Sequence, residues 1–290
     1  FDKRVRVAEA SVAAIHFAQG RWGEAEAIAA RLLAEQPQHH FIRSQALTIL
    51  ARIGTRRGTG GARALLDEVW QLLTDTFPSD RWEIAAAQAE YAWLDGQSEM
   101  IPAIVSDLWE EAVATDTGHL AGELAYWLWR ADALFVPLTD IAEPFALHLS
   151  GDWSGAADAW ERLGCPYEQA VALADGDEAA MRRALVIFTS LGAEPAGNRL
   201  RERMRRAGVA RIPARPRRST QAAPAHLTRR QRECLVLVEQ GLTHGETAER
   251  LYITEKTAGH RVSAVVGKLD ARTRTEAASR AWRVGSGPFE

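Results

Sequence analysis

The strongest constraint on the fold lies between residues 227 and 269, where three short helical patterns are separated by turns of only a few residues. Threonines precede a Glu or Gln by three positions, which is the spacing of a capping box at a helix start. A glycine follows the first pattern, where a helix commonly ends in a left-handed residue. These signals are carried by Thr228 with Gln231, Gly241, Thr243 with Glu246, and Thr254. Such short connections favour a helix-turn-helix.

The third helical pattern, residues 255–269, is apolar on one side and polar on the other. The apolar residues recur at three- and four-residue spacing, and they are Ala258, Val262, Val265 and Leu269. The opposite face carries Lys256, Gly259, His260, Ser263 and Gly267. This is the layout of a helix that packs on two neighbours and lies with its polar side in the major groove of DNA.

The formal net charge of −3 conceals an asymmetry along the chain. Residues 1–200 hold 16 Lys and Arg against 29 Asp and Glu, a balance of −13. Residues 201–290 hold 19 against 9, a balance of +10. A basic segment attracts a polyanion through counterion release, although it supplies no sequence preference. The asymmetry therefore predicts a nucleic-acid partner for the C-terminal part.

Residues 1–207 are expected to form an array of helical hairpins. Apolar residues recur at helical spacing, and no alternating strand pattern appears. A Gly-x-Trp phrase at 20–27 returns at 151–160, each time between two helical patterns. The first hairpin resembles a tetratricopeptide unit in the spacing of Ala13, Ala25 and Pro37. Several stacked, tetratricopeptide-like hairpins are expected, because one pair cannot bury its own apolar face.

Nine of the ten tryptophans lie between Trp22 and Trp160. They either line an aromatic groove for a ligand or fill the gaps between stacked hairpins. We favour the second interpretation, because Trp127 and Trp129 belong to an apolar helix expected over 124–134.

Residues 208–226 are expected to link two domains. Prolines at 213, 216 and 224 prevent a continuous helix, and four arginines keep the segment solvated. Further arginines begin at Arg201. They either touch the phosphate backbone beside a DNA site or form a solvated hinge, and the sequence leaves both open.

Residues 227–283 resemble the LuxR-type helix-turn-helix domain, also called the GerE type. The matching positions are Leu227, Thr228, Arg230, Glu233, Gly241, Leu242, Thr243, Glu246, Ala248, Glu249, Leu251, Lys256, Thr257, Lys268, Leu269, Arg274, Glu276 and Ala277. The resemblance implies an all-α chain that ends in a four-helix DNA-binding domain over 227–290. It also implies that the last helix, from Arg274 to Trp282, pairs two copies in a homodimer.

The resemblance and the helix geometry together assign the expected DNA contacts. His260 and Ser263 are expected to read base edges, and Gly259 to permit close approach of the backbone. Phosphate contacts are expected from Lys256, Thr257, Arg261, Arg230, Thr243 and Lys268. For each polar residue the alternative is a solvated surface. Double-stranded promoter DNA is the expected partner, and RNA polymerase and a protein or small-molecule effector at the helical repeats are further candidates.

Several positions differ from the family pattern. The family usually has other residues at Gln231, His244, Thr247, Ala258, Arg261, Asp270 and Ala271. The smaller Thr247 and Ala258 predict a less stable core, and Asp270 would cost about 1 kcal/mol where a positive φ is needed. Arg261 is expected to add either a phosphate contact or a base contact, so the DNA sequence preferred by relatives is not assigned to this chain.

Other functional classes lack the motifs they need, so we expect no enzyme. The three lysines follow no Gly-rich turn; an ATPase would have to precede residue 1, and no cofactor is expected in this chain. No GxSxG, HExxH or CxxC motif occurs, and His39–His40 lacks a second pair of metal ligands.

The sequence also predicts a cytoplasmic protein that does not associate with a membrane. No apolar run approaches the roughly 18 residues of a membrane span, and no secretory signal opens the chain. Two distant cysteines fit a reducing compartment. The absence of an initiator Met indicates a fragment or a processed piece of a longer protein. The large ATP-dependent LuxR regulators of bacteria, which place an ATPase before a helical region and a terminal DNA-binding domain, are similar in organisation.

Two functions are consistent with these features. The first is a bacterial transcription regulator whose helical repeats sense a signal and whose C-terminal domain binds promoter DNA. The second is a protein-interaction scaffold with a degenerate DNA-binding domain, which the departures from the family pattern favour.

Overall fold

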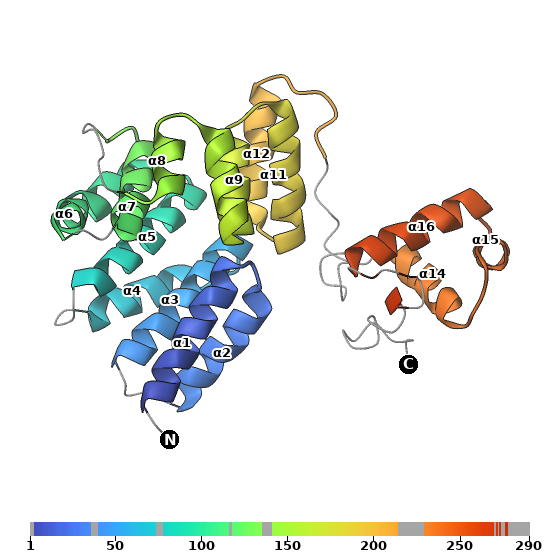
Figure 1. The fold of residues 1–290 in the computed structure, drawn as a ribbon, viewed down its shortest axis with the longest axis horizontal. Coiled ribbons are helices and arrows are strands. Elements are labelled where there is room, and N and C mark those ends of the chain that lie inside the picture. The colour runs from blue at the N-terminus through green and yellow to red at the C-terminus, as the bar shows by residue number, and fades with distance from the viewer. Residues whose placement is uncertain are drawn as a thin grey trace. The chain divides into compact units, whose positions relative to one another are not determined.

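The computed structural model describes residues 3–35, 40–73, 78–115, 118–134, 141–213, 229–269, 271, 273 and 276–277. These residues form helices and no strand, which confirms the expected all-α class. The chain divides into two compact units, residues 1–213 and 214–290. Figure 1 shows both units. We call the first unit the helical body.

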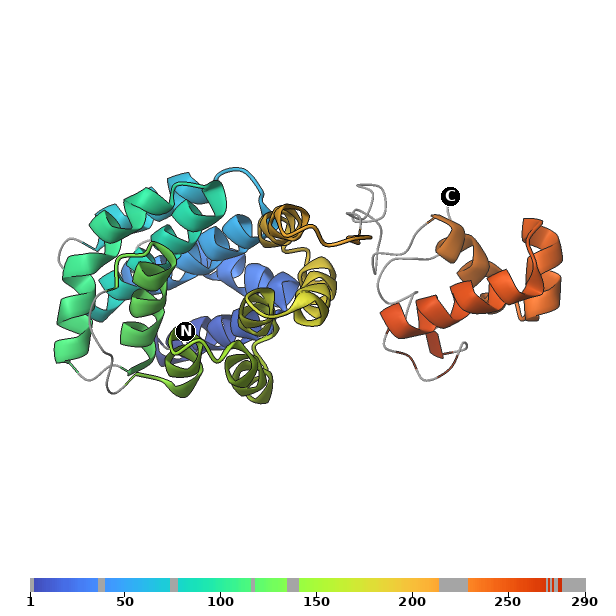
Figure 2. The same cartoon turned by 90° about the horizontal axis from the view of Figure 1, so that it is seen from above.

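The helical body is a continuous series of packed helices. Each helix contacts the next one along the chain, and the path curves until the last helix, α12, lies beside α3 and α5 (Figures 1 and 2). The helices are α1 (Lys3–Ala18), α2 (Trp22–Glu35), α3 (His40–Arg57), α4 (Ala62–Leu72), α5 (Pro78–Asp95), α6 (Ile101–Ala114), α7 (Gly118–Arg130), α8 (Glu143–Leu149), α9 (Trp153–Leu163), α10 (Pro166–Ala174), α11 (Glu178–Leu191) and α12 (Glu194–Arg206), with the short 3-10 helix η1 (Ser98–Met100) before α6.

Each of the two Gly-x-Trp phrases lies at the turn between two consecutive helices, the first between α1 and α2 and the second between α8 and α9. Asp152 caps α9 by accepting a hydrogen bond from the Gly155 amide at 2.8 Å. Gly20, with φ of 73°, turns the chain between α1 and α2. A Cβ at Gly20 would lie 2.6 Å from Leu191 Cδ2 and 2.9 Å from Pro166 Cγ. The first hairpin therefore packs against α10 and α11, far along the sequence, and the tetratricopeptide-like repeat itself stays a prediction.

The expected helix over 124–134 ends earlier than predicted. α7 stops at Arg130, and Asp132 has a positive φ of 54°. The Ala133 amide then donates to the Leu128 carbonyl at 2.9 Å, which closes the helix end. Asp tolerates the left-handed region better than most residues, so the chain can turn there although its apolar pattern continues.

The tryptophans fill the core of the helical body, as predicted. Trp22, Trp82, Trp127 and Trp160 are buried. The other five between Trp22 and Trp160 are partly buried and pack against the same apolar cluster. The interpretation as core side chains is therefore confirmed.

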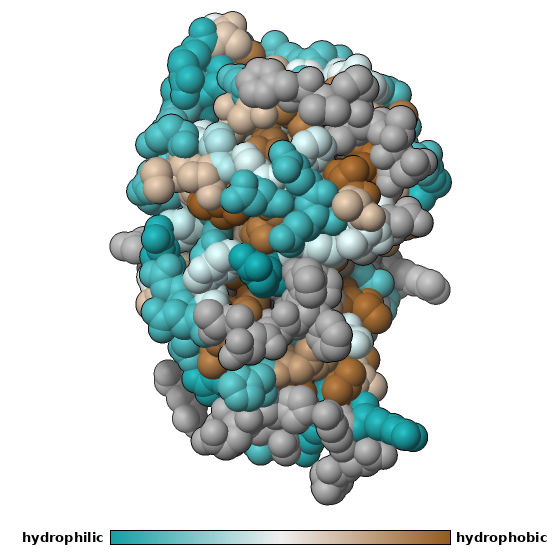
Figure 3. Space-filling model, turned by 90° about the vertical axis from the view of Figure 1, so that its left-hand side faces the viewer, coloured by the Kyte–Doolittle hydropathy of each residue, from teal (hydrophilic) through white to brown (hydrophobic). Residues whose placement is uncertain are grey.

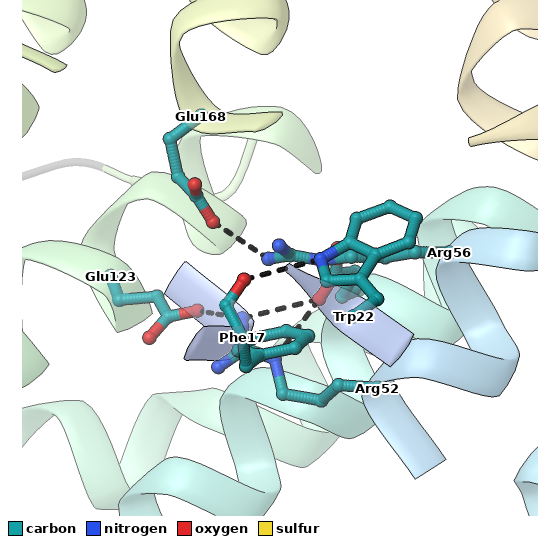
Figure 4. Close-up of polar contacts among 7 residues, drawn as sticks. Phe17, Trp22, Arg52, Arg56, Glu123 and Glu168 are labelled. Carbon is teal, nitrogen blue, oxygen red and sulfur yellow. Dashed lines mark hydrogen bonds and ion pairs between the residues drawn. The ribbon is translucent and has the colours of Figure 1, made fainter. Parts of the chain in front are cut away.

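A cluster of five charged side chains lies inside the helical body (Figure 4). Arg56, only 2% exposed, donates from Nε to Glu90 and from Nη2 to Glu168, both at 2.8 Å. Arg52, one helical turn earlier, pairs with Glu90 and Glu123. The carboxylates belong to α5, α7 and α10, so one stretch of α3 connects three other helices. We call these five residues the buried charge cluster.

Aromatic rings enclose the Arg56 guanidinium. Its carbon lies 3.7 Å from the centroid of the Tyr167 ring and 4.4 Å from that of Phe17. Burial alone would lower the pKa of Arg56, but the charges of Glu90 and Glu168 outweigh it and raise that pKa above its ordinary value. The arginine is therefore held in its charged form within the core.

The last residues of this unit pack onto it beyond α12. Val209 and Ile212 lie against the core, and Arg201 Nε donates to the Pro213 carbonyl at 3.0 Å. Residues 208–213, which the sequence assigned to the linker, thus belong to the helical body. The rest of the expected linker, 214–226, lies outside the described residues.

One face of the structure is a mosaic of residue types. In Figure 3 hydrophobic areas alternate with hydrophilic ones wherever residues are described, which is usual for a water-exposed surface. Within the described part of the chain, every helix is too short or too polar to cross a bilayer.

We predict that Glu90→Gln lowers the free energy of unfolding of the helical body by about 3–5 kcal/mol, because two arginines then lose a buried counter-charge. Urea unfolding followed by tryptophan fluorescence measures this, since nine of the ten tryptophans lie in the helical body. Asp67→Asn is the control, because its pair with Arg63 is exposed and worth less than about 1 kcal/mol. Equal effects of the two variants would contradict the prediction.

Candidate nucleic-acid interface

The C-terminal unit contains three described helices that build a helix-turn-helix. They are α14 (Arg229–Glu239), α15 (His244–Leu251) and α16 (Glu255–Lys268). Gly241, with φ of 86°, ends the first helix as predicted. Glu276 and Ala277 are also helical, and the Glu276 amide donates to Thr273 Oγ1 at 3.1 Å. The remainder of the expected fourth helix, and Thr228 of the first capping box, lie outside the described residues.

A capping box fixes the start of α15. The Glu246 amide donates to Thr243 Oγ1 at 3.3 Å, and the Thr243 amide donates to Glu246 Oε2 at 2.7 Å. The hydrogen bond from the Thr243 backbone, followed by that from its hydroxyl, lowers the pKa of Glu246. Glu246 therefore caps the helix as a carboxylate at neutral pH.

A tight turn joins α15 to α16. Tyr252 has a left-handed backbone with φ of 54°, and its side chain is 95% exposed. Thr254 caps α16 by accepting from the Thr257 amide at 3.2 Å. The short turn that the sequence predicts before residue 255 and the predicted cap at Thr254 are confirmed.

The inner faces of these helices form the core of the unit, and that of α16 consists of the four apolar residues predicted from the sequence. The residues of these inner faces are less than 9% exposed except Leu251, which is partly buried, and they are Cys234, Leu235, Val238, Thr247, Ala248, Leu251, Ala258, Val262, Val265 and Leu269. Thr247 Oγ1 is enclosed without a hydrogen-bond partner among the described residues. A buried hydroxyl in this state costs about 1–3 kcal/mol. The core is therefore weakened where the family usually has an apolar residue.

Three of the expected contact residues share the exposed side of α16. Lys256, His260 and Ser263 are exposed and follow one another at helical spacing. Because α16 packs its apolar side on α14 and α15, this polar side faces away from the unit. The structure thus brings the two candidate base-reading residues, His260 and Ser263, onto the same exposed side as Lys256.

The other expected contacts lie in different surroundings. Thr243 is exposed but engaged in its capping box, and Thr257 shares a hydrogen bond of 2.8 Å with Thr254. Arg261 is only partly exposed, with Nη1 shielded from solvent and unpartnered among the described residues. Arg230 lies in α14 and Lys268 ends α16, but their side chains are outside the described set. Their roles stay predictions.

Gly259 faces a neighbouring side chain that the sequence analysis did not place. A Cβ at Gly259 would lie 3.5 Å from Nδ1 of His244, and His244 Nε2 is buried without a partner among the described residues. The sequence drew attention to His244 only as a departure from the usual Asn. Gly259 therefore lies beside the His244 ring at the junction of α15 and α16, at a distance where a Cβ would make an ordinary van der Waals contact.

A helix capped at Thr254, exposed on one side and packed across a second short helix, has the arrangement of a helix-turn-helix. Residues 225–281 match the family described as GerE, bacterial regulatory proteins of the luxR family. The C-terminal unit is thus a LuxR-family helix-turn-helix domain, as its motifs predicted.

Two curated proteins of Bacillus subtilis (strain 168) are similar to this part of the chain. Transcriptional regulatory protein LnrK is 44% identical over 63 residues, and transcriptional regulatory protein LiaR is 39% identical over 75 residues. These stretches cover 22% and 25% of this chain, and 29% and 36% of the relatives. The chain thus spans about a third of the length of the curated relatives it matches. No solved structure matches it.

We predict that Thr247→Val stabilises the C-terminal unit by about 1–2 kcal/mol, because it removes an unpartnered buried hydroxyl without changing the shape of the side chain. Hydrogen exchange of the α15 and α16 amides, followed by mass spectrometry, measures the change. Thr254→Val is the matched control, since the same substitution there removes a helix cap and costs about 1 kcal/mol. Faster exchange in Thr247→Val would show that the hydroxyl has a stabilising partner.

Proposed function

We propose that this chain is a bacterial transcription regulator that places α16 in the major groove of promoter DNA. The observation that supports this most directly is the exposed row of Lys256, His260 and Ser263 on a helix whose opposite side is buried. The matched family and both relatives are described as regulatory proteins, which favours the same function here.

The exposed residues divide into two roles. His260 and Ser263 lie on consecutive turns of α16 and carry groups that donate to or accept from base edges, so they are proposed to set sequence preference. Lys256, in the first turn, carries a flexible ammonium and is proposed to bind phosphate. The excess of basic residues after position 200 adds attraction that is independent of sequence.

Arg261 is proposed to act on phosphate after a change of side-chain conformation. Its shielded, unpartnered nitrogen lacks the acceptor that a guanidinium requires. A phosphate oxygen on bound DNA would supply that acceptor.

The assembly around this domain is proposed from the resemblance to LuxR regulators. Two copies would bind a two-fold-symmetric site through the segment from 274 to 282, and the complex would contact RNA polymerase. The helical body in front of the DNA-binding domain supports an organisation like that of the large ATP-dependent LuxR regulators. A P-loop in the coding sequence upstream of residue 1 would support this organisation.

The second candidate is a scaffold whose DNA-binding domain has lost its function. The unpartnered hydroxyl of Thr247 favours it, because a weakened core would reduce the folded fraction of the domain. The two candidates differ in one property, which is sequence-specific binding of DNA.

We predict that His260→Ala and Ser263→Ala each weaken binding to preferred DNA by roughly tenfold or more, since one good base contact contributes about 1–3 kcal/mol of discrimination. Lys256→Ala should instead weaken binding to all DNA and reduce the salt dependence by about one phosphate contact. Fluorescence anisotropy at several salt concentrations measures both, with duplexes selected by the wild-type chain from a random pool.

Gln240→Ala is the matched control, because Gln240 is an exposed, uncharged residue of the same unit that is not part of α16. It should bind like the wild-type chain. Failure of the folded wild-type chain to select any sequence would reject the regulator and support the scaffold.

A further inference from the structure

A cavity of about 270 Å³ lies in the helical body where α12 meets α5, α7, α10 and α11. Its apolar lining includes Phe188 and Leu200, which are buried. The charged residues around it are Arg130, Asp175, Arg199, Glu202, Arg203 and Arg206. Four arginines against two acids leave two positive charges in excess.

Both acids at this cavity already pair with arginines that line it. Asp175 already pairs with Arg130 and Arg203, and His148 Nε2 lies 2.8 Å from its Oδ2. Burial alone would raise the pKa of Asp175, but the hydrogen bond from His148 and the charge of Arg130 hold it well below its usual value. Glu202 is exposed and lies 3.8 Å from Arg206.

Arg199 lacks a direct ion pair among the described residues: burial lowers its pKa, the charge of Glu202 raises it only in part, and Arg130 and Arg206 lower it further. No described residue makes a hydrogen bond or ion pair with it, and its guanidinium carbon lies 4.7 Å from the centroid of the Trp93 ring. Arg130 lies 5.3 Å from the same ring. Trp93 thus contacts two guanidinium groups at the cavity, of which only that of Arg130 forms a direct ion pair with an acid.

We propose that this cavity binds a small organic phosphate, whose dianionic head pairs with Arg199 and Arg203 and whose apolar part lies against Phe188 and Leu200. A phosphate monoester is close to doubly charged at neutral pH, which matches the excess of two. Guanidinium groups bind phosphate oxygens through paired N–H donors. A carboxylate would neutralise only half of the excess.

The position of the cavity connects it to regulation. Arg199 and Arg203 lie on α12, and Arg201 of the same helix holds the Pro213 carbonyl at the end of the helical body. From α11, Arg182 donates to the Arg211 carbonyl at 3.0 Å. A ligand that shifts α12 would therefore also shift residues 211–213, which precede the C-terminal unit along the chain. This effector role rests on the proposed function, whereas the binding of the anion does not.

Titration calorimetry of the full chain with phenyl phosphate, inorganic phosphate and benzoate at constant ionic strength tests the site. We expect saturable binding of both phosphates, tighter for phenyl phosphate, and at least about tenfold weaker binding in Arg199→Gln. Arg63→Gln, an exposed arginine distant in sequence, should leave binding unchanged. Absence of saturable binding, or benzoate binding as tightly as phenyl phosphate, would overturn the proposal.

A second variant guards against a folding defect in Arg199→Gln. Glu202→Gln removes an exposed carboxylate and raises the excess charge to three, so it should tighten phosphate binding. Weaker or unchanged binding would overturn the proposal.

DNA affinity is then measured with and without phenyl phosphate. An unchanged DNA affinity rejects the effector role, and a chain that binds phenyl phosphate but no DNA rejects the regulator function while the site stands.

Discussion

The helical body depends on the buried charge cluster around Arg56. Moving a charge from water into a protein interior costs several kcal/mol, and that cost is offset only when each ion finds its partners. Here the partners of α3 come from α5, α7 and α10, in addition to the aromatic rings of Phe17 and Tyr167. An arrangement with any of these helices out of place would leave a charge buried and unpaired. The cluster therefore selects one packing of helices whose Ala-rich faces are otherwise similar.

The same cluster explains the closed path of the helices. Open arrays of hairpins bury apolar surface only between neighbours along the chain. In this body Glu168 reaches Arg56 across 112 residues, and α12 returns to α3 and α5. Contacts between distant helices give the body an interior rather than a single concave face, and cavities such as the one beside Arg199 lie where these distant helices meet.

Features set by residues close together in the sequence could be predicted, whereas features that depend on residues far apart in the sequence could not. The turns of the C-terminal unit were predicted correctly because each cap, such as Thr243 with Glu246, acts within four residues. The end of α7 was predicted wrongly because Asp132 turns the chain inside an apolar pattern. The pairs of the buried charge cluster could not be predicted, since glutamates and arginines at helical spacing are usually solvated. The exposed side of α16 could be predicted from the three- and four-residue spacing of its apolar residues. The position of Gly259 beside His244 could not, because it depends on how α15 packs across α16.

The two units therefore tolerate change in different ways. In the helical body, loss of the Glu90 carboxylate removes a partner of both Arg52 and Arg56, so a single substitution there affects several helix contacts. The C-terminal unit has a small core, and the unpartnered hydroxyl of Thr247 reduces its stability further. A ligand that binds only the folded form stabilises that form by mass action. Under the proposed function, bound DNA would accordingly stabilise this unit more than the helical body, and the proposed contact residues would also affect how much of the unit is folded.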